Sequence, residues 1–335
     1  MSFTAVGDLA QSLAMRRHSS ALQTRMSQLT QELTTGQAAN ISRHLQGGFN
    51  QLSDIENQLT LNVSYKSAAA EATVFTSAMQ AALEHVQNGL SDLSSEVLLT
   101  SNATGPTELH TTAENARATL DLIVSAMNTD TAGRPLFSGT DVANAPLSNA
   151  DVVLDAARAA IAGAPDAATV DITLETFFMT PGAGFDTLIY QGGTQDMSPY
   201  RLGAGEDVTL SIRADDPIIR AALKDTVMAA LADDTSLTLG GSDRVDLLTR
   251  ASKGLLQQID GVTRLRADLG FAEERLEQIA TRTATETTSL QMARNQLLSV
   301  DPFETASALE ETQLRLETLY TITARTSRLN LVNFL

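Results

Sequence analysis

A seven-residue repeat of apolar residues near the C-terminus constrains the fold most strongly. It predicts one long helix with a narrow apolar seam, formed by Leu248, Leu255, Val262, Leu265, Leu269, Leu276, Ile279, Leu290 and Leu297. No proline lies between Ile218 and Asp301, so a helix from about residue 244 to residue 298 is uninterrupted. Such a helix is about 80 Å long at 1.5 Å per residue. Because a seam of that length needs partners of similar length, we expect a rod or bundle rather than an enzyme pocket.

The composition agrees with closely packed helices. Aromatic residues make up 4% of the 335 residues and Trp is absent, so the core must be built mainly from Ala, Leu, Ile, Val and Met. The chain has no Cys, which excludes disulfides, thiolate catalysis and cysteine metal sites. No apolar run reaches the roughly 20 residues of a membrane-spanning helix, and the N-terminus lacks the layout of a cleaved signal peptide. We therefore expect no membrane insertion and no cleaved leader.

The net charge of −17 argues against nucleic acid as a partner, because phosphate binding requires a basic surface. Most of this charge lies in the middle third of the chain. Residues 140–243 contain 16 acidic and 5 basic side chains. We expect this segment to face solvent, and the nearly balanced ends of the chain to associate.

Proline divides the sequence into helical ends and a broken centre. None precedes Pro106, seven lie from Pro106 to Pro217, and Pro302 is the last. A first helix is predicted from apolar residues on one face: Met15, Leu22, Met26, Leu29 and Leu33. Gly36 offers its stop, and further helices are predicted over about 52–97 and 109–127.

The centre is predicted to be α+β. Residues 170–178 alternate between apolar and mostly polar side chains, and Val208, Leu210 and Ile212 repeat the alternation, so both segments are predicted as strands. Two short helices are expected over 151–161 and 217–231. The second has Asp216 as its N-cap, followed by a proline in the first turn.

The last helix carries a clear start signal, with Asp301 as cap, Pro302 at the first position and Glu304 in the first turn. It is predicted to run towards residue 330 with these apolar residues: Leu309, Leu316, Leu319, Ile322 and Leu329. Several Thr residues interrupt that face. The two terminal helices are therefore expected to pair as a coiled coil, to be weakly ordered in the free monomer, and to gain stability from neighbouring subunits.

The sequence gives little evidence for a catalytic or ligand-binding site. The four His residues have no second ligand at helical spacing, and the pairs Asp215-Asp216 and Asp233-Asp234 lack the pattern of a calcium loop. Helix capping and solvated loops explain these Asp pairs better. The central glycines lack the context of a phosphate-binding loop, and no Ser-His-Asp order stands out. We expect no enzyme activity, no metal and no cofactor.

Four segments resemble the bacterial flagellin family. Leu33 to Gly36 is similar to the family's Leu-Ser-Ser-Gly turn after the first helix, and Gly133 to Thr140 resembles the passage from the rod to the variable domain. Arg266 to Leu276 follows the pattern Arg-Ala-x-Leu-Gly-x-x-x-x-Arg-Leu, and Asp301 to Leu335 resembles the terminal block. The resemblance covers residues 1–140 and 244–335.

Two departures accompany this resemblance. Arg43 to Phe49 stands where the family usually has an Asp-Asp-Pro or Asp-Asp-Ala element, which leaves the lateral contacts made there open. Met1 to Asp8 lacks the opening of most filament flagellins. Within the family, this second departure favours the hook-associated protein that joins hook to filament.

The fold class predicted is mainly α, a long antiparallel helical rod with an inserted α+β domain. Residues 36–139 and 244–300 are assigned to the rod, residues 140–243 to a solvent-exposed acidic insert, and residues 1–35 and 301–335 to a coiled-coil assembly domain. The seam should then serve as the spine of one subunit, and the terminal helices should join subunits.

The resemblance implies a structural adaptor between hook and filament, exported through the flagellar type III route to the extracellular flagellum. Its expected partners are further copies of itself, neighbouring hook-associated proteins, flagellin, and an export chaperone on the C-terminal helix. A filament flagellin is the alternative. A binding protein or enzyme built on the acidic centre is the third hypothesis.

Overall fold

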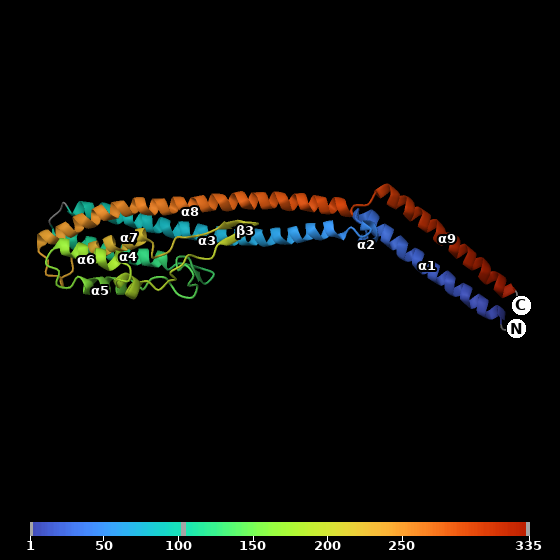
Figure 1. Cartoon of the computed structure of the whole chain (residues 1–335), viewed down its shortest axis with the longest axis horizontal. Coiled ribbons are helices and arrows are strands. Elements are labelled where there is room, and N and C mark those ends of the chain that lie inside the picture. Colours follow the sequence, from blue (N-terminus) through green and yellow to red (C-terminus); the bar gives the residue numbers. More distant parts are fainter. Residues whose placement is uncertain (1–2, 102–104, 333–335) are drawn as a thin grey trace. The chain divides into compact units, whose positions relative to one another are not determined.

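The computed structural model describes residues 3–101 and 105–332, with side chains over 10–101 and 105–325, and it has a mainly α fold (Figure 1). The chain forms two compact units. The terminal unit consists of residues 1–63 and 284–335, and the central unit consists of residues 64–283. The long helices α3 (Phe49–Ser101) and α8 (Gly241–Leu298) contribute residues to both units.

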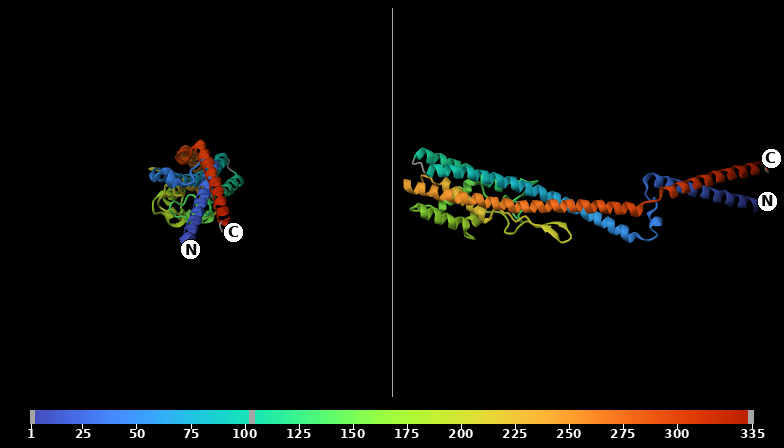
Figure 2. Two further views of the ribbon diagram at one scale, coloured as in Figure 1. Left: turned by 90° about the vertical axis from the view of Figure 1, so that its right-hand side faces the viewer. Right: turned by 90° about the horizontal axis from the view of Figure 1, so that it is seen from above.

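The terminal unit is built around two antiparallel helices, α1 (Phe3–Thr35) and α9 (Pro302–Val332). They lie side by side in all views, and the start of α1 lies near the end of α9 (Figures 1 and 2). A short helix that the sequence did not predict, α2 (Ile41–Leu45), follows α1. It begins where the side chain of Asn40 accepts a hydrogen bond from the backbone N–H of Arg43.

The turn after α1 and the turn between α8 and α9 hold each other in place. Gly36 ends α1, as predicted, in the left-handed conformation with φ of +69°, which glycine adopts without a Cβ penalty. Its carbonyl accepts a hydrogen bond from the N–H of Val300, and Ala38 N–H donates to the carbonyl of Leu298. This exchange satisfies backbone groups that the two helix ends leave unpaired.

The central unit contains the remaining elements. These are α4 (Pro106–Met127), β1 (Asp130–Thr131), β2 (Arg134–Pro135), α5 (Ala150–Ala160), α6 (Ala167–Met179), the π-helix η1 (Phe185–Ile189), β3 (Tyr200–Gly203), β4 (Glu206–Val208) and α7 (Pro217–Ala230). β1 pairs antiparallel with β2, with Asp130 opposite Pro135. β3 pairs antiparallel with β4, with Tyr200 opposite Val208.

One apolar core joins the insert to the long helices of the central unit. It includes these fully buried residues from α3, α4, α5, α6, α7 and α8: Leu83, Leu120, Val153, Phe178, Leu223 and Leu255. Small side chains let α7 approach closely, because Ala222, Ala229 and Ala230 are fully buried. The boundaries of the compact units therefore do not coincide with the ends of the segment 140–243.

The predicted strand over 170–178 is wrong, because these residues lie in α6. Asp166 caps this helix by accepting a hydrogen bond from the N–H of Thr169, and the buried residues Val170, Leu174 and Phe178 recur every four positions. Ile172, which strand alternation would bury, is 68% exposed. The alternation of β-branched residues concealed a helical period that tertiary packing selects.

The predicted strand over 208–212 is only partly correct. Val208 ends β4, whereas Leu210 and Ile212 lie in irregular chain beyond the strand. All three side chains are buried, as the alternation predicted. The pattern therefore identified which side chains enter the core, but not whether their backbone pairs with another strand.

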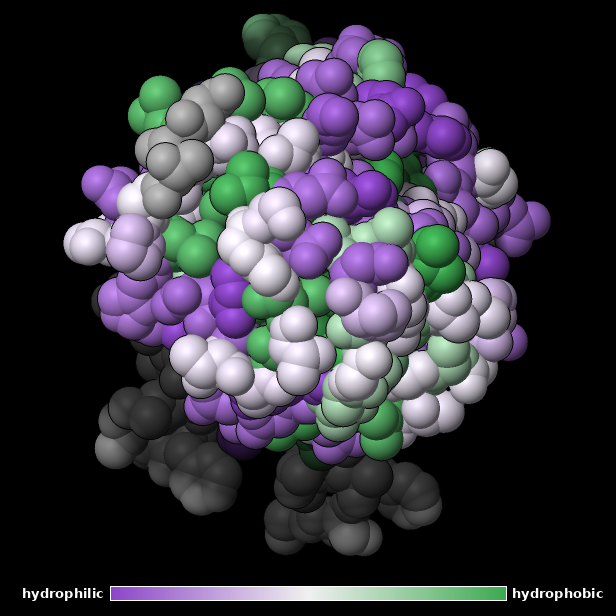
Figure 3. Space-filling view, turned by 90° about the vertical axis from the view of Figure 1, so that its left-hand side faces the viewer, coloured by the Kyte–Doolittle hydropathy of each residue, from purple (hydrophilic) through white to green (hydrophobic). Residues whose placement is uncertain are grey.

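One end of the central unit shows how its surface is divided between polar and apolar groups. In this view, small groups of apolar side chains are separated by polar ones (Figure 3). Isolated apolar residues on a surface are ordinary. This face of the molecule therefore gives no sign of a large docking patch.

Candidate assembly surfaces

The predicted seam of α8 is buried within the chain along most of its length. Its first seven members, Leu248 to Ile279, belong to the central unit and are 0–7% exposed. Leu290 and Leu297 belong to the terminal unit and are half-buried. Most of the seam is therefore covered by other parts of the same chain, and little of its apolar surface is available to a neighbouring subunit.

Polar side chains fix the register of α3 against α8. In the central unit, Gln80 Nε2 donates a hydrogen bond to the carbonyl of Arg266 at 2.8 Å, and Arg266 Nη1 donates to Gln87 Oε1 at 2.6 Å. In the terminal unit, Arg294 forms an ion pair with Glu56. The two helices therefore run antiparallel in both units, as the predicted rod requires.

The predicted assembly residues of α1 and α9 form a thin interface. Leu29 is buried, at 2% exposed, while the following are only half-buried: Met15, Leu22, Met26, Leu309, Leu316 and Leu319. Leu33 and Ile322 are 41% and 47% exposed. The side chain of Leu329 lies outside the described residues. Two helices that bury so little apolar surface gain little stability from each other.

An apolar groove runs along this helix pair. It has a volume of about 420 Å³ and is lined by His18, Leu22, Leu314, Arg315, Thr318, Leu319 and Ile322. Leu13 and Tyr320 are also 47% and 48% exposed on the same two helices. Contiguous exposed apolar surface is typical of protein interaction sites.

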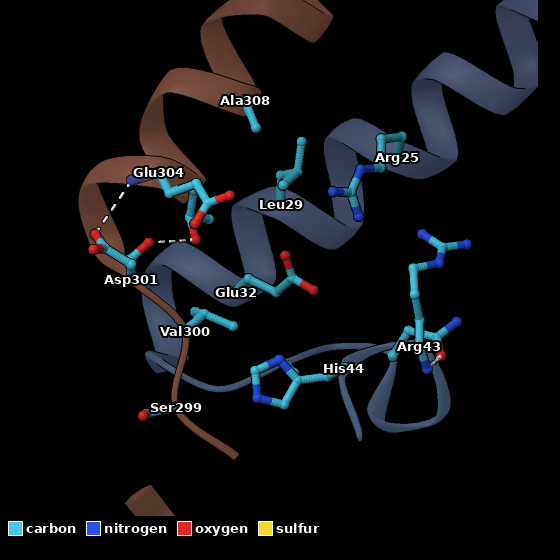
Figure 4. A pocket seen from close by; sticks show the side chains of 13 residues that line it. Arg25, Leu29, Glu32, Arg43, His44, Ser299, Val300, Asp301, Glu304 and Ala308 are labelled. Atoms are coloured by element: carbon cyan, nitrogen blue, oxygen red, sulfur yellow. Dashed lines mark hydrogen bonds between the residues drawn. The ribbon is translucent and has the colours of Figure 1, made fainter. Parts of the chain in front are cut away.

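A polar cavity of about 270 Å³ lies where α1, α2 and α9 meet (Figure 4). Asp301 caps α9, as predicted, by accepting a hydrogen bond from the N–H of Phe303 at 2.7 Å. Glu32 is 9% exposed and accepts a hydrogen bond from the N–H of Ala39 at 3.1 Å. These carboxylates hold turns, and Arg25 and Arg43 line the same cavity, so its charges are mixed and do not define a ligand.

A buried carboxylate in the central unit was missed by sequence reasoning. Asp225 on α7 is 2% exposed, and burial raises its pKa to about 6 despite Lys224 at 3.3 Å. Gln258 Nε2 also donates to it, at 3.3 Å. A Cβ on Gly254 would come within 2.2 Å of Asp225 Oδ2. The sequence signal was an Asp among the apolar residues of α7, with a glycine on the facing helix.

The Asp pairs noted in the sequence have structural partners. Asp216 caps α7 by accepting a hydrogen bond from the N–H of Ile218, and Asp215 forms an ion pair with Arg213 at 2.8 Å. Asp233 lies 2.8 Å from His110, and Asp234 lies 2.6 Å from Arg158. Helix capping, hydrogen bonding and ion pairing thus account for these four carboxylates.

The described residues contain neither a cluster of metal ligands nor a helix that could span a membrane. Within residues 10–101 and 105–325, whose side chains the structure describes, no group of three or more His, Cys, Asp or Glu side chains is placed to hold a metal ion. In the same part of the chain, no helix combines the length and hydropathy needed to cross a membrane.

Comparison with known proteins connects these helices to a family. Residues 253–335, which include most of α8 and all of α9, match the bacterial flagellin C-terminal helical region. The crystal structure of Bacillus cereus FlgL aligns with 71% of this chain and 96% of its own, with 16% sequence identity and a TM-score of 0.52. The chain therefore has a FlgL-like fold, and its C-terminal region is similar to that of bacterial flagellin.

A second solved structure supports the same fold for this chain. It is described as a flagellar hook-associated protein from Vibrio parahaemolyticus, and it aligns with 73% of this chain and 95% of its own, with 16% identity and a TM-score of 0.50. No curated protein matches the chain. At this level of identity, the structural likeness establishes the fold and leaves the role in the flagellum to be proposed.

Proposed function

We propose that this protein is a flagellin-family structural adaptor that joins the flagellar hook to the filament. The observation that carries this proposal is the α1–α9 pair, in which long helices expose apolar side chains that a monomer does not need. Leu314 and Phe303 on α9 are 64% and 82% exposed. Flanking subunits in a tubular array would cover such residues and supply the stability that the pair lacks.

The proposed contacts are heterologous, so that one patch meets a different patch on the next copy and assembly continues around a ring. The spine of each subunit is the α3–α8 pair, and residues 1–35 and 301–335 join subunits. The proposed partners are further copies of this chain, neighbouring hook-associated proteins and flagellin. An export chaperone would cover the exposed apolar residues of α9 before secretion to the cell exterior.

Deletion of the gene tests this role. We expect cells that make hooks but no filaments and that release flagellin monomers into the medium, with recovery when the wild-type gene is returned. Intact filaments in the deletion strain would refute the proposal. A normal hook with loss of the major filament protein would instead identify the chain as a filament flagellin, the alternative that the family match also allows.

Copy number separates the same two alternatives without genetics. An adaptor should be present as roughly one ring of subunits per flagellum, whereas a flagellin is present in thousands of copies. Quantitative mass spectrometry of isolated flagella, with hook protein as the internal standard, gives this ratio. A ratio to hook protein far above one ring would count against the adaptor.

A further inference from the structure

An exposed aromatic residue interrupts the polar outer face of α8 in the central unit. Phe271 is 70% exposed, and it follows Leu269, which is 2% exposed, by two positions. Two residues turn an α-helix by about 200°, so Phe271 points away from the core. The adjacent Gly270 lies within the helix, where glycine is less stable than alanine, yet a Cβ there would meet no atom within 4 Å. No contact within the described part of the subunit explains why glycine, rather than alanine, precedes this exposed aromatic residue.

The outer face of α3 in the central unit carries an uncovered apolar stripe. Val74 is 55% exposed, and Ala70 and Ala81 are also exposed. Val74 follows the fully buried Ala72 by two positions, which directs it away from the core in the same way as Phe271. The stripe offers a shallow surface into which an aromatic ring can pack.

The Phe271 surface and the Val74 stripe lie at the same height along the helix pair. Gln80 and Glu84 of α3 both contact Arg266 of α8, through a hydrogen bond of 2.8 Å and an ion pair of 3.2 Å. Because the helices run antiparallel, this register places Phe271 within about one turn of Ser77, between Val74 and Ala81. Two copies placed side by side without an axial shift would therefore bring Phe271 of one onto this stripe of the other.

The charges beside these two surfaces are complementary. Arg264 lies two helical turns before Phe271 on the same exposed face of α8, and the described residues give it no ion-pair partner. Glu84 continues the stripe on α3, with its side chain 56% exposed. The same register places Arg264 level with Glu84 to within about one turn. A neighbouring copy placed without an axial shift would therefore make both an apolar contact and a charge pair.

We infer that Phe271 of one subunit packs on the Val74 stripe of a second copy of this chain, with Arg264 facing Glu84 of that copy. The occupant is another copy because one chain presents both surfaces at matching height and with opposite charges. The contact is heterologous, so it can continue from subunit to subunit. This inference rests on the proposed function and adds a lateral contact of the central unit to the contacts of the terminal helices.

Cysteine cross-linking tests the contact, because the chain has no Cys of its own. A variant with Ser77→Cys and Phe271→Cys should form a ladder of disulfide-linked oligomers when flagella are isolated from cells that express it and are oxidised. The matched control carries Ser91→Cys and Phe271→Cys. Ser91 is also exposed on α3 but lies about 21 Å further along the helix, so this control should form no ladder.

The outcomes separate this contact from the proposed function. Variant protein present in flagella without a ladder would overturn the lateral contact and leave the adaptor role intact. Dimers from Phe271→Cys alone would also overturn it, because they would show an isologous contact. Absence of the wild-type chain from flagella would contradict the proposed function, and with it the array in which this contact is placed.

Charge reversal gives a second measurement on the same cross-link. Arg264→Glu should lower the ladder yield of the Ser77/Phe271 cysteine variant several-fold, and adding Glu84→Arg should restore it. Because Glu84 also contacts Arg266 within its own chain, circular dichroism and the melting temperature must show that each variant is folded. A ladder yield unchanged by Arg264→Glu would remove the charge pair from the contact.

Discussion

The central unit and the terminal unit use the same kind of helix in opposite ways. In the central unit, α8 buries Leu248, Leu255 and Val262 to 0–1% exposure against helices on several sides. In the terminal unit, α1 and α9 pack against each other, and Leu29 is the one member of the predicted set that the described side chains show fully buried. A long amphipathic helix is stabilised within the subunit where its apolar face is surrounded; where that face is only half covered, we propose that it joins neighbouring subunits.

Breaking α9 should give the largest effect. Leu316→Pro removes a backbone hydrogen bond from the middle of the helix and costs about 3 kcal/mol or more of helix stability. We expect flagellar assembly to stop while the central unit keeps its melting transition, measured by electron microscopy and calorimetry. Leu316→Ala is the matched control and should assemble at least partly. Normal junctions in the proline variant would remove α9 from its proposed role.

Amide hydrogen exchange should separate the two units in dilute monomer. The core of α8 in the central unit should approach the protection set by global unfolding, whereas α1 and α9 should open at free energies near zero. The reason is that few apolar contacts hold the terminal pair. Mass spectrometry of peptides from both units measures the difference, and equal protection of the two would contradict the comparison.

Replacing one leucine in each unit with alanine should show the same difference in stability between the central unit and the terminal pair. Leu255→Ala leaves a cavity in the core of the central unit and should lower its free energy of unfolding by about 2–5 kcal/mol, measured by urea denaturation. Leu22→Ala, in the half-covered pair, should change monomer stability by less than about 0.5 kcal/mol. A large loss from Leu22→Ala would show that the terminal pair is a stable part of the monomer.

Substitution of the buried Asp225 should change the stability of the central unit by a smaller amount, which depends on pH. Burial raises its pKa in the folded chain to about 6, above the ordinary value of 3.8, so folding favours the protonated form. Its contribution to stability is complete below about pH 4 and is lost as the pH rises through 6. Asp225→Asn should therefore stabilise the central unit by about 1–2 kcal/mol at pH 8, by about half as much at pH 5, and by little at pH 4.

Asp234 provides a control for that measurement, because its substitution should change the stability in the opposite direction. Burial acts to raise its pKa, but hydrogen bonds from Ser236 and Arg158 outweigh burial and hold the pKa at about 2. A lowered pKa means that the charged form stabilises the fold above about pH 4 and that this contribution fades as the pH falls towards 2. Asp234→Asn should thus destabilise the chain at pH 8. A gain in stability there would contradict this sign.

Features set by local chemistry were predictable from the sequence. Gly36 ends α1, while Asp301 and Asp216 cap α9 and α7, because each depends on one side chain or one backbone angle. The register of Gln80 and Arg266 was not predictable, because it depends on which helices meet. Asp225 was hidden for the same reason, since its burial requires α7 to lie against α8 at Gly254.

The sequence by itself determined the mainly helical class, the long seam and the positions where helices stop. These follow from periodicity, proline and capping, which act within a few residues. Only the tertiary structure decided that residues 170–178 are helical and that the insert shares the core of α3, α4 and α8. Apolar residues such as Val170 and Leu174 suit either a strand or a helix locally, and burial against distant parts of the chain selects between them.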